Sequence, residues 1–235
     1  MIADKTFYVD PKNVIGATFI LDEEESHHII QVFRLELGSV VYLLNGIGSS
    51  YRATISSING GIVSGKIEDK LESFGENKIH IRIAPAIIKR NRFENLLEKV
   101  TELGAKEIQP LLTDRSIKRT INIERCKKII ISASKQCQRS HLPIIHKPID
   151  ISSWLNDLEG QCFAAIQEAK DHLSTLNIEK NKVVNVMIGP EGDFSKKEVQ
   201  TMKNMGVEFY SLGVRRLRTE TAALSTMSIL NELMI

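Results

Sequence analysis

Two polar segments near the end of the chain carry residue types that bind anions and accept protons. The first, GPEGDF at 189–194, combines tight glycine turns with the carboxylates of Glu191 and Asp193. The second, LGVRRLRTET at 212–221, contains three arginines followed by Glu220. Cations so close together repel each other unless an anionic partner lies near. The second segment therefore predicts an electrostatic role toward a negatively charged group.

Each of these segments follows a predicted strand. Residues 183–188 are nearly all apolar and show no polar alternation, which is typical of a strand covered on both faces of a parallel sheet. A second apolar run at 207–212 predicts another strand. Ligands of open α/β sheets bind beyond the carboxyl ends of the strands, so we expect the two segments to outline one pocket. The alternatives are an ordinary strand-to-helix turn for the first segment and a solvated charge cluster for the second.

A helix is predicted after each segment. Ser195 and Glu198 have the spacing of a capping box, so the first helix should begin near Lys196, and Gly206 suits its left-handed exit. From Thr221 onward, apolar residues recur at three- and four-residue steps and predict one buried face of a final helix. These residues are Ala223, Met227, Leu230 and Met234.

The rest of the chain divides at a polar, glycine-containing linker at 73–78. Before it, short apolar runs separated by turns predict a small β-barrel, with strands at 6–9, 15–21, 40–45, 51–58 and 62–67. After it, predicted strands and helices alternate, which indicates an α/β sheet with crossover helices. The strands are 80–88, 107–113, 142–147 and 162–167, and the helices are 89–105, 122–138 and 150–158.

One segment of the first part has a helical pattern. In SHHIIQVFRLELG at 26–38, we expect one or two helical turns with Ile29, Val32 and Phe33 facing inward and Arg34 outward.

Composition excludes several classes of protein. The 235 residues are 42% hydrophobic, which is ample for a globular core, and the net charge of +2 argues against a strongly basic nucleic-acid binder overall. The N-terminus lacks the regions of a signal peptide and no apolar run has the length of a membrane span, so we expect a cytoplasmic protein without a membrane partner. The three cysteines and six histidines fit neither a disulfide framework nor a metal site. Nucleotide-binding GxGxxG, phosphate-loop and GxSxG motifs are missing.

The two polar segments together carry a family resemblance. Residues 188–195 (IGPEGDFS) and 212–224 (LGVRRLRTETAAL) resemble the signature of the RsmE family, which are SPOUT-class methyltransferases that modify N3 of a uridine in small-subunit ribosomal RNA. The resemblance extends upstream through TELGAKEIQPLLTDRS at 101–116 and SASKQCQRSHLP at 132–143. It therefore covers nearly the whole chain.

Two positions depart from the family pattern. Asp193 stands where the family usually has a second consecutive glycine, and Arg216 stands where an apolar residue is commoner. Aspartate is among the few residues that tolerate a left-handed backbone. Neither departure removes a residue that we assign to chemistry.

The resemblance implies a fold and partners. It implies a PUA-like β-barrel RNA-binding domain at 1–72 and a SPOUT α/β methyltransferase domain at 73–235, whose parallel sheet ends in a C-terminal trefoil knot. It also implies S-adenosyl-L-methionine as cofactor, no metal, a homodimer, and small-subunit rRNA or the 30S subunit as partner. The implied target is U1498 of 16S rRNA, which would become m3U.

The implied reaction makes physical demands on the site. Uridine N3 carries a proton at neutral pH and becomes a good nucleophile only as that proton leaves, so the site needs a base or groups that stabilise the uracil anion. Arg218 is our first choice for the electrostatic role, with Glu220 orienting it or accepting the proton. Glu191 is the second candidate base. The alternative for Glu220 is a first-turn carboxylate favoured by the helix dipole.

The expected cofactor and RNA contacts come from several segments. Among the RNA contacts the resemblance implies His28 and Arg34, and the others are basic or polar candidates for binding phosphates. The cofactor contacts, mostly backbone, are Ile166, Gln167, Gly189, Glu191, Gly192, Leu212, Gly213, Leu217, Thr221 and Ala222. The RNA contacts are His28, Arg34, Lys89, Arg90, Arg92, Arg115, Gln136 and Arg139, and for each of them a solvated surface position is the alternative.

Two other functions stay open. One is an RNA-binding protein with a catalytically inactive SPOUT domain, and the other is a phosphate-binding module that uses the amides of GPEGDF.

Overall fold

The computed structural model describes residues 5–116, 118–156 and 158–233, which form two compact units. Unit 1 consists of Met1–Glu76 and Ile131–Leu142, and unit 2 consists of Asn77–Ile130 and Pro143–Ile235. Helix α3 (Ile123–Cys137) thus contributes its first half to unit 2 and its second half to unit 1. The predicted domains, 1–72 and 73–235, did not assign any of α3 to the first unit.

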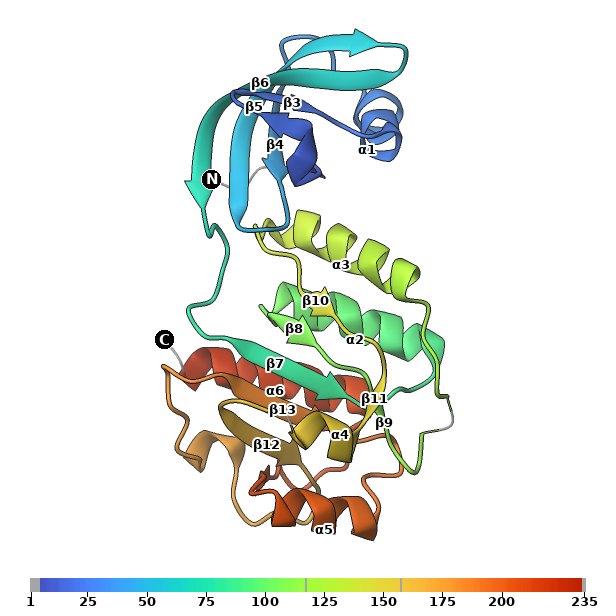
Figure 1. Cartoon of the computed structure of the whole chain (residues 1–235), viewed down its shortest axis with the longest axis vertical. Coiled ribbons are helices and arrows are strands. Elements are labelled where there is room, and N and C mark those ends of the chain that lie inside the picture. Colours follow the sequence, from blue (N-terminus) through green and yellow to red (C-terminus); the bar gives the residue numbers. More distant parts are fainter. Residues whose placement is uncertain (1–4, 117, 157, 234–235) are drawn as a thin grey trace. The chain divides into compact units, whose positions relative to one another are not determined.

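Unit 1 is built on a six-stranded sheet in the order β1-β4-β5-β6-β3-β2 (Figure 1). The pair β1 and β4 is parallel and the other pairs are antiparallel. Alternate residues of the strands face an apolar core that contains Phe7, Phe19 and Leu43, each fully buried. The elements are β1 (Thr6–Tyr8), η1 (Pro11–Asn13), β2 (Val14–Ile15), β3 (Thr18–Ile20), β4 (Val40–Leu44), β5 (Ser49–Asn59) and β6 (Ile62–Glu72).

The helical segment of unit 1 differs from its prediction. It consists of α1 (Glu23–His27) followed by a π-helical turn, η2 (His28–Phe33). Ile29 is buried as expected, but Val32 is 60% exposed and Phe33 is 37% exposed. The prediction that Val32 faces inward was wrong, because a π-turn closes i→i+5 hydrogen bonds and no longer aligns residues three and four apart. Phe33 faces the core in part, since its ring packs edge-on against the buried Phe7 ring with centroids 5.4 Å apart.

Unit 2 contains a six-stranded sheet in the order β10-β8-β7-β13-β12-β14, and every pair in it is parallel. All residues of β13 are buried, as its nearly all-apolar run predicts. The predicted parallel α/β architecture is therefore confirmed. The strands are β7 (Ile81–Pro85), β8 (Glu107–Ile108), β10 (Ile144–Ile145), β12 (Gln161–Ala165), β13 (Val184–Ile188) and β14 (Glu208–Tyr210).

Helices cover both faces of this sheet (Figure 1). On one face, α4 (Ile151–Asn156) and α5 (Lys196–Asn204) pack Trp154 and Met202 against Met187 of β13. Elsewhere α6 (Thr219–Leu233) contacts β7, β13 and α2 (Arg90–Glu102). A short turn, η3 (Leu173–Thr175), precedes β13.

The predicted helix termini near the two polar segments were largely accurate. The Ser195 hydroxyl accepts from the Glu198 amide at 3.2 Å and the Glu198 carboxylate accepts from the Ser195 amide at 2.7 Å, which confirms the capping box. Gly206, after α5, has a φ of 76°, as a left-handed exit requires. The last helix begins two residues before the predicted Thr221, at Thr219. Met234 lies outside the described residues.

The predicted strand at 107–113 is two short strands in two sheets. β8 joins the main sheet, whereas β9 (Leu111–Leu112) pairs with β11 (Ile149–Asp150). Pro110 lies between β8 and β9 and has no N–H to donate to a strand ladder, which ends the first pairing.

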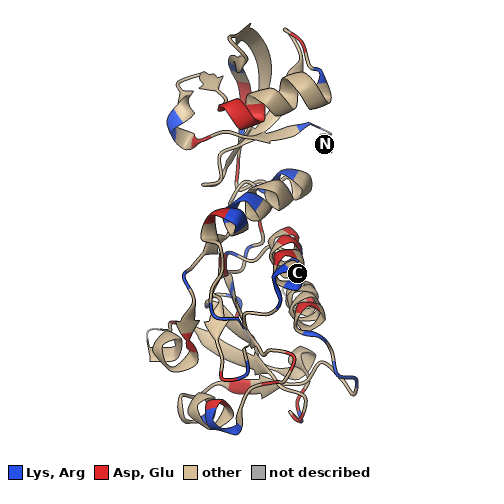
Figure 2. Ribbon diagram, turned by 90° about the vertical axis from the view of Figure 1, so that its right-hand side faces the viewer, with Lys and Arg blue, Asp and Glu red and all other residues tan. Residues whose placement is uncertain are grey.

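Basic and acidic residues are interspersed over both units (Figure 2). No cluster of three or more His, Cys, Asp or Glu side chains in the described part of the chain could hold a metal ion. No helix among these residues has the length and apolarity needed to cross a membrane. The trefoil knot stays a prediction.

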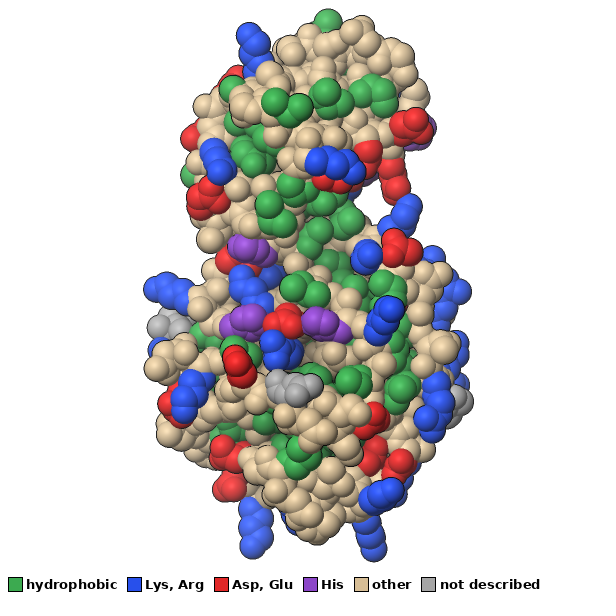
Figure 3. All heavy atoms as spheres, viewed as in Figure 1, with side chains coloured by type: hydrophobic (Ala, Val, Ile, Leu, Met, Phe, Trp, Pro, Cys, Tyr) green, Lys and Arg blue, Asp and Glu red, His purple; other side chains and the backbone are tan. Residues whose placement is uncertain are grey.

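A polar cluster surrounds Glu107 on β8. Its carboxylate contacts Nε2 of His80, a guanidinium nitrogen of Arg82 and Nε2 of His146, each at 2.7 Å. On the face drawn in Figure 3, two histidine side chains flank an acidic one. Burial would raise the pKa of Glu107, but the hydrogen bonds from Arg82, His146 and His80 outweigh it and lower that pKa to about 2.

Candidate active site

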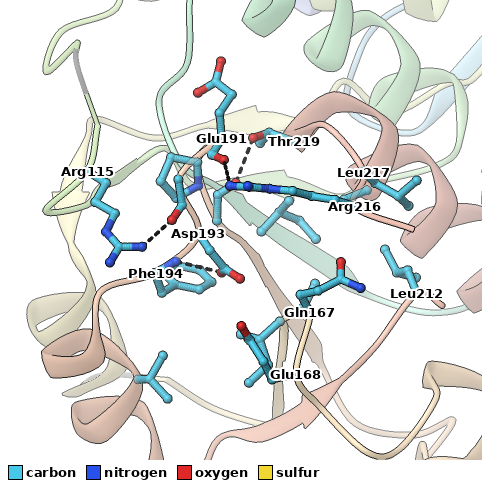
Figure 4. A pocket seen from close by; sticks show the side chains of 18 of the residues that line it. Arg115, Gln167, Glu168, Glu191, Asp193, Phe194, Leu212, Arg216, Leu217 and Thr219 are labelled. Carbon is cyan, nitrogen blue, oxygen red and sulfur yellow. Dashed lines mark hydrogen bonds between the residues drawn. The ribbon is translucent and has the colours of Figure 1, made fainter. Parts of the chain in front are cut away.

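A cavity of about 740 Å³ lies at the carboxyl ends of the adjacent strands β13, β12 and β14 (Figure 4). Its walls come from the loops that leave these strands, together with one face of α5 and the start of α6. The volume is in the range of pockets that enclose drug-sized ligands. Both polar segments singled out in the sequence contribute to this one cavity.

The loop after β13, residues 189–194, is shaped by its glycines and by Asp193. Asp193 has a φ of 63°, its amide donates to the Pro190 carbonyl at 2.9 Å, and its carboxylate accepts from the Phe194 amide at 2.7 Å. A Cβ added at Gly189 would come within 3.3 Å of the buried Phe194 ring. Aspartate therefore keeps the left-handed turn at the position where the family usually has glycine.

Hydrogen bonds tie the loops of the cavity together. The Arg216 side chain extends to the Glu191 carbonyl and donates to it at 2.5 Å (Figure 4). The Thr219 hydroxyl, almost fully buried, donates to the Gly189 carbonyl at 2.9 Å. The Gln167 side-chain amide donates to the Gly213 carbonyl at 3.0 Å, which attaches the loop after β12. Arg216, the second departure from the family pattern, thus joins the two polar segments.

Arg92, from the first turn of α2, lies between the two candidate bases. Its guanidinium donates to Glu191 Oε1 at 3.1 Å and its Nε lies 3.7 Å from Glu220 Oε1. The Glu220 side chain is only 15% exposed, and its Oε2 is buried without a hydrogen-bond partner among the described residues. A buried carboxylate oxygen without a donor is costly in a merely structural group but suits a group that accepts a proton from a ligand.

The predicted cofactor residues lie mostly in the cavity wall. Gly213 and Thr221 are outside the lining, although the Gly213 carbonyl holds Gln167. The predicted residues in the lining are Ile166, Gln167, Gly189, Glu191, Gly192, Leu212, Leu217 and Ala222. Of the predicted catalytic residues, Glu191 lines the cavity, whereas Glu220 and Arg218 lie outside the lining. Arg92, also outside the lining, links Glu220 to Glu191, and Arg218 is exposed.

Sequence reasoning missed one whole wall of the cavity. Lys196, Val199, Gln200 and Lys203 line it from α5. Their spacing of three, four and seven residues marks one face of a helix, so the periodicity of 196–203 would have identified them once α5 was placed beside the pocket. Other lining residues that were not among the predicted cofactor-binding or catalytic residues include Arg115, Glu168, Asp193, Phe194, Arg215, Arg216 and Thr219.

The residues predicted to bind RNA occupy different environments. Lys89 and Arg90 are exposed at the start of α2, and Gln136 is exposed on α3. In unit 1, Arg34 is exposed and has a φ of 51°, and His28 is half-buried beside the Phe33 ring. Arg92 contacts carboxylates of the site, and Arg115 donates to the Gly192 carbonyl.

The structure contradicts the predicted RNA contact of Arg139. Its side chain is 2% exposed and donates twice to the Glu76 carboxylate, at 3.1 and 2.9 Å. A guanidinium buried in a bidentate ion pair is not presented to an RNA phosphate, so the prediction of an RNA contact was wrong. The position lies just after α3, which ends at Cys137, and the sequence pattern alone does not reveal which unit encloses it.

Two protein-family models and several known proteins match this chain. Residues 75–231 match a family model described as an RNA methyltransferase domain, and residues 21–68 match one described as an RNA methyltransferase PUA domain. The chain is 30% identical, over 89% of its length and 87% of the relative, to the ribosomal RNA small subunit methyltransferase E of Rickettsia conorii.

Solved structures resemble the whole chain. One is a ribosomal RNA small subunit methyltransferase E from Neisseria gonorrhoeae bound to S-adenosyl methionine, with a TM-score of 0.90, 25% identity and 97% of both chains covered. Another is a putative methyltransferase from Legionella pneumophila in complex with the same cofactor, with a TM-score of 0.89, 29% identity and 98% of both chains covered. The likeness extends over both units.

Proposed function

Since the chain belongs to the RNA methyltransferase family of the ribosomal RNA small subunit methyltransferase E proteins, we propose that it methylates small-subunit ribosomal RNA with S-adenosyl-L-methionine. The observation that carries this proposal is the single cavity enclosed by the loops after β12, β13 and β14. Relatives that share the fold over 97% of this chain or more bind S-adenosyl methionine.

The residues of the cavity fit this cofactor. The backbone at Gly189 and Gly192 is bare of side chains, and a Cβ at Gly192 would come within 3.1 Å of the Arg115 side chain. Main chain can therefore approach a ligand closely here. The backbone of Gly189, Leu212 and Leu217 would hold the adenosine, with Ile166 and Ala222 as apolar walls. When bound, the cofactor supplies an electrophilic methyl group on a sulfonium sulfur.

The finer assignment is methylation at N3 of a uridine, with U1498 of 16S rRNA as the expected target. Glu220 accepts the N3 proton, because its Oε2 is buried and has no donor among the described residues. Arg92 holds the other oxygen of that carboxylate and also holds Glu191 in place. Arg218 stabilises the negative charge that develops on the uracil oxygens.

The remaining proposals concern partners and assembly. The match of 21–68 to an RNA methyltransferase PUA domain supports RNA binding by unit 1, with His28 and Arg34 as contacts. A homodimer, a cytoplasmic location and the trefoil knot rest on the family resemblance. An inactive SPOUT domain has no support from Asp193, because that residue keeps the left-handed turn and lines the cavity.

Two measurements test the function. Titration calorimetry with S-adenosyl-L-methionine should show binding to the purified protein, and mass spectrometry of rRNA from small subunits incubated with both should show one added methyl group on a uridine. Absence of the added methyl group would refute the activity. A methyl group at another position of the uridine would refute only the N3 assignment.

A matched pair of variants tests the proposed base. Glu220→Gln removes the proton acceptor and should lower turnover about 10²- to 10⁴-fold while leaving cofactor affinity within a few-fold. Glu232→Gln makes the same change at an exposed position in the last turn of α6 and should behave as wild type. Equal turnover of the two variants would exclude Glu220 as the base.

A further inference from the structure

A second, smaller cavity of about 170 Å³ lies beside the first turn of α2. Its floor is apolar, formed by Ile87, Ile88, Phe93 and Cys126, each 2–3% exposed. The opening is bordered by exposed cations of three separate segments, Arg90, Lys118 and Arg125. Within the described part of the chain, none of its lining residues also lines the larger cavity.

The cations at this opening exceed the anions. Glu94, the carboxylate in the lining, accepts from Arg90 Nε at 2.8 Å and from a terminal nitrogen of Arg125 at 2.8 Å. The hydrogen bonds from Arg125 and Arg90 lower the pKa of Glu94 to about 2, so among the described lining residues one negative charge faces three positive ones. An apolar floor with a cationic border is complementary to a base whose neighbouring phosphates stay outside.

The first turn of α2 separates this cavity from the proposed active site. Arg92 points from that turn to Glu191 and Glu220, whereas Arg90, Phe93 and Glu94 line the second cavity. A helix is about 10–12 Å across with its side chains. A few nucleotides of an extended RNA strand are enough to span this width.

We infer that the second cavity takes one unstacked pyrimidine base of the substrate RNA, near the methylated uridine. This inference rests on the proposed function. A cavity of about 150 Å³ holds one benzene ring, so about 170 Å³ accommodates a single six-membered ring but not the fused rings of a purine. Sequence-specific RNA recognition takes splayed bases into such apolar sites, while Arg90, Lys118 and Arg125 bind the flanking phosphates.

The first test fills the cavity. Ile121, half-buried in the lining, is replaced by tryptophan, and Ile123→Trp is the control because Ile123 is equally half-buried nearby but lines neither cavity. Affinity is measured by filter binding to small subunits whose rRNA lacks the methyl group. We expect Ile121→Trp to weaken binding about tenfold, the value of one lost base contact, and Ile123→Trp to bind as wild type.

The second test removes one cation. Arg125→Ala should reduce the slope of log affinity against log salt by about 1, as the loss of one phosphate contact does. Lys127→Ala is the control, because Lys127 is exposed on the same helix, pairs with Glu124 at 2.9 Å and lies outside the cavity. Unchanged binding by both Ile121→Trp and Arg125→Ala would overturn the inference.

Ultraviolet crosslinking identifies the base. After crosslinking of the wild-type protein to the same small subunits, a peptide containing Phe93 or Cys126 should carry a uridine or cytidine adduct. A purine adduct there, or adducts only on other peptides, would overturn the assignment. All variants must retain wild-type affinity for S-adenosyl-L-methionine, which verifies folding. If the wild-type protein did not methylate the rRNA, the proposed function would be refuted. That outcome is distinct from the binding and crosslinking results that would refute the base-binding cavity.

Discussion

Replacing Arg139 with methionine should destabilise unit 1 and leave RNA affinity unchanged. The side chains of Arg139 and Glu76 are 2% and 4% exposed, and two hydrogen bonds of 2.9 and 3.1 Å join them. The same carboxylate accepts a hydrogen bond from the His141 backbone amide at 3.0 Å. Glu76 therefore connects the end of the 1–76 segment to the residues that follow α3, within unit 1.

The expected loss follows from this burial. Methionine keeps much of the volume of arginine but leaves a buried carboxylate without its cation, and breaking a buried pair from one side costs about 3–5 kcal/mol. In a chain of this size each kcal/mol corresponds to about 2–4 °C. We therefore expect the melting temperature of the Arg139→Met variant to fall by about 6–20 °C.

Urea and thermal unfolding followed by circular dichroism measure this loss. The double variant Arg139→Met with Glu76→Leu should regain much of the lost stability, because it buries no unpaired charge. Ser132→Ala, at an exposed position on α3, is the control and should stay within about 0.5 kcal/mol of wild type. If Arg139→Met left the unfolding midpoint unchanged and weakened RNA binding, the reasoning would be refuted and Arg139 would be an RNA contact.

Three further changes probe the site and the sheet. Arg218→Ala should lower turnover at least 100-fold with cofactor affinity within a few-fold by calorimetry, and loss of cofactor binding instead would remove Arg218 from the catalytic role. Thr219→Val removes the 2.9 Å hydrogen bond to the Gly189 carbonyl and should weaken cofactor binding about tenfold, whereas unchanged affinity would show that the loop keeps its position without it. Because the folded-state pKa of Glu107 is depressed from 4.5 to about 2, its ionised form stabilises the fold above about pH 4.5, and this contribution is lost as the pH falls toward 2. Glu107→Gln should therefore be less stable than wild type at neutral pH, with a difference in unfolding midpoint that shrinks between pH 4.5 and 2, and a difference independent of pH would contradict the assignment.

Local patterns in the sequence determined the elements that frame the site. The apolar run at 183–188 predicts a strand buried on both faces, and the spacing of Ser195 and Glu198 predicts the start of α5, because these features depend on residues a few positions apart. The paired motifs of 188–195 and 212–224 indicated the family and one shared pocket. The same patterns did not predict the π-turn at His28–Phe33 or the break between two strands at Pro110, because neither feature changes the apolar pattern.

Tertiary structure alone decided which distant side chains meet. Nothing in the sequence near Arg92 indicates that it lies between Glu191 and Glu220, or that Arg139 is enclosed with Glu76. The face of α5 in the cavity likewise depends on where the loops beside it pass. Periodicity records which side of an element is buried, whereas the partner that buries it is set by the packing of segments as many as 154 residues apart, as Asn77 and Asn231 are.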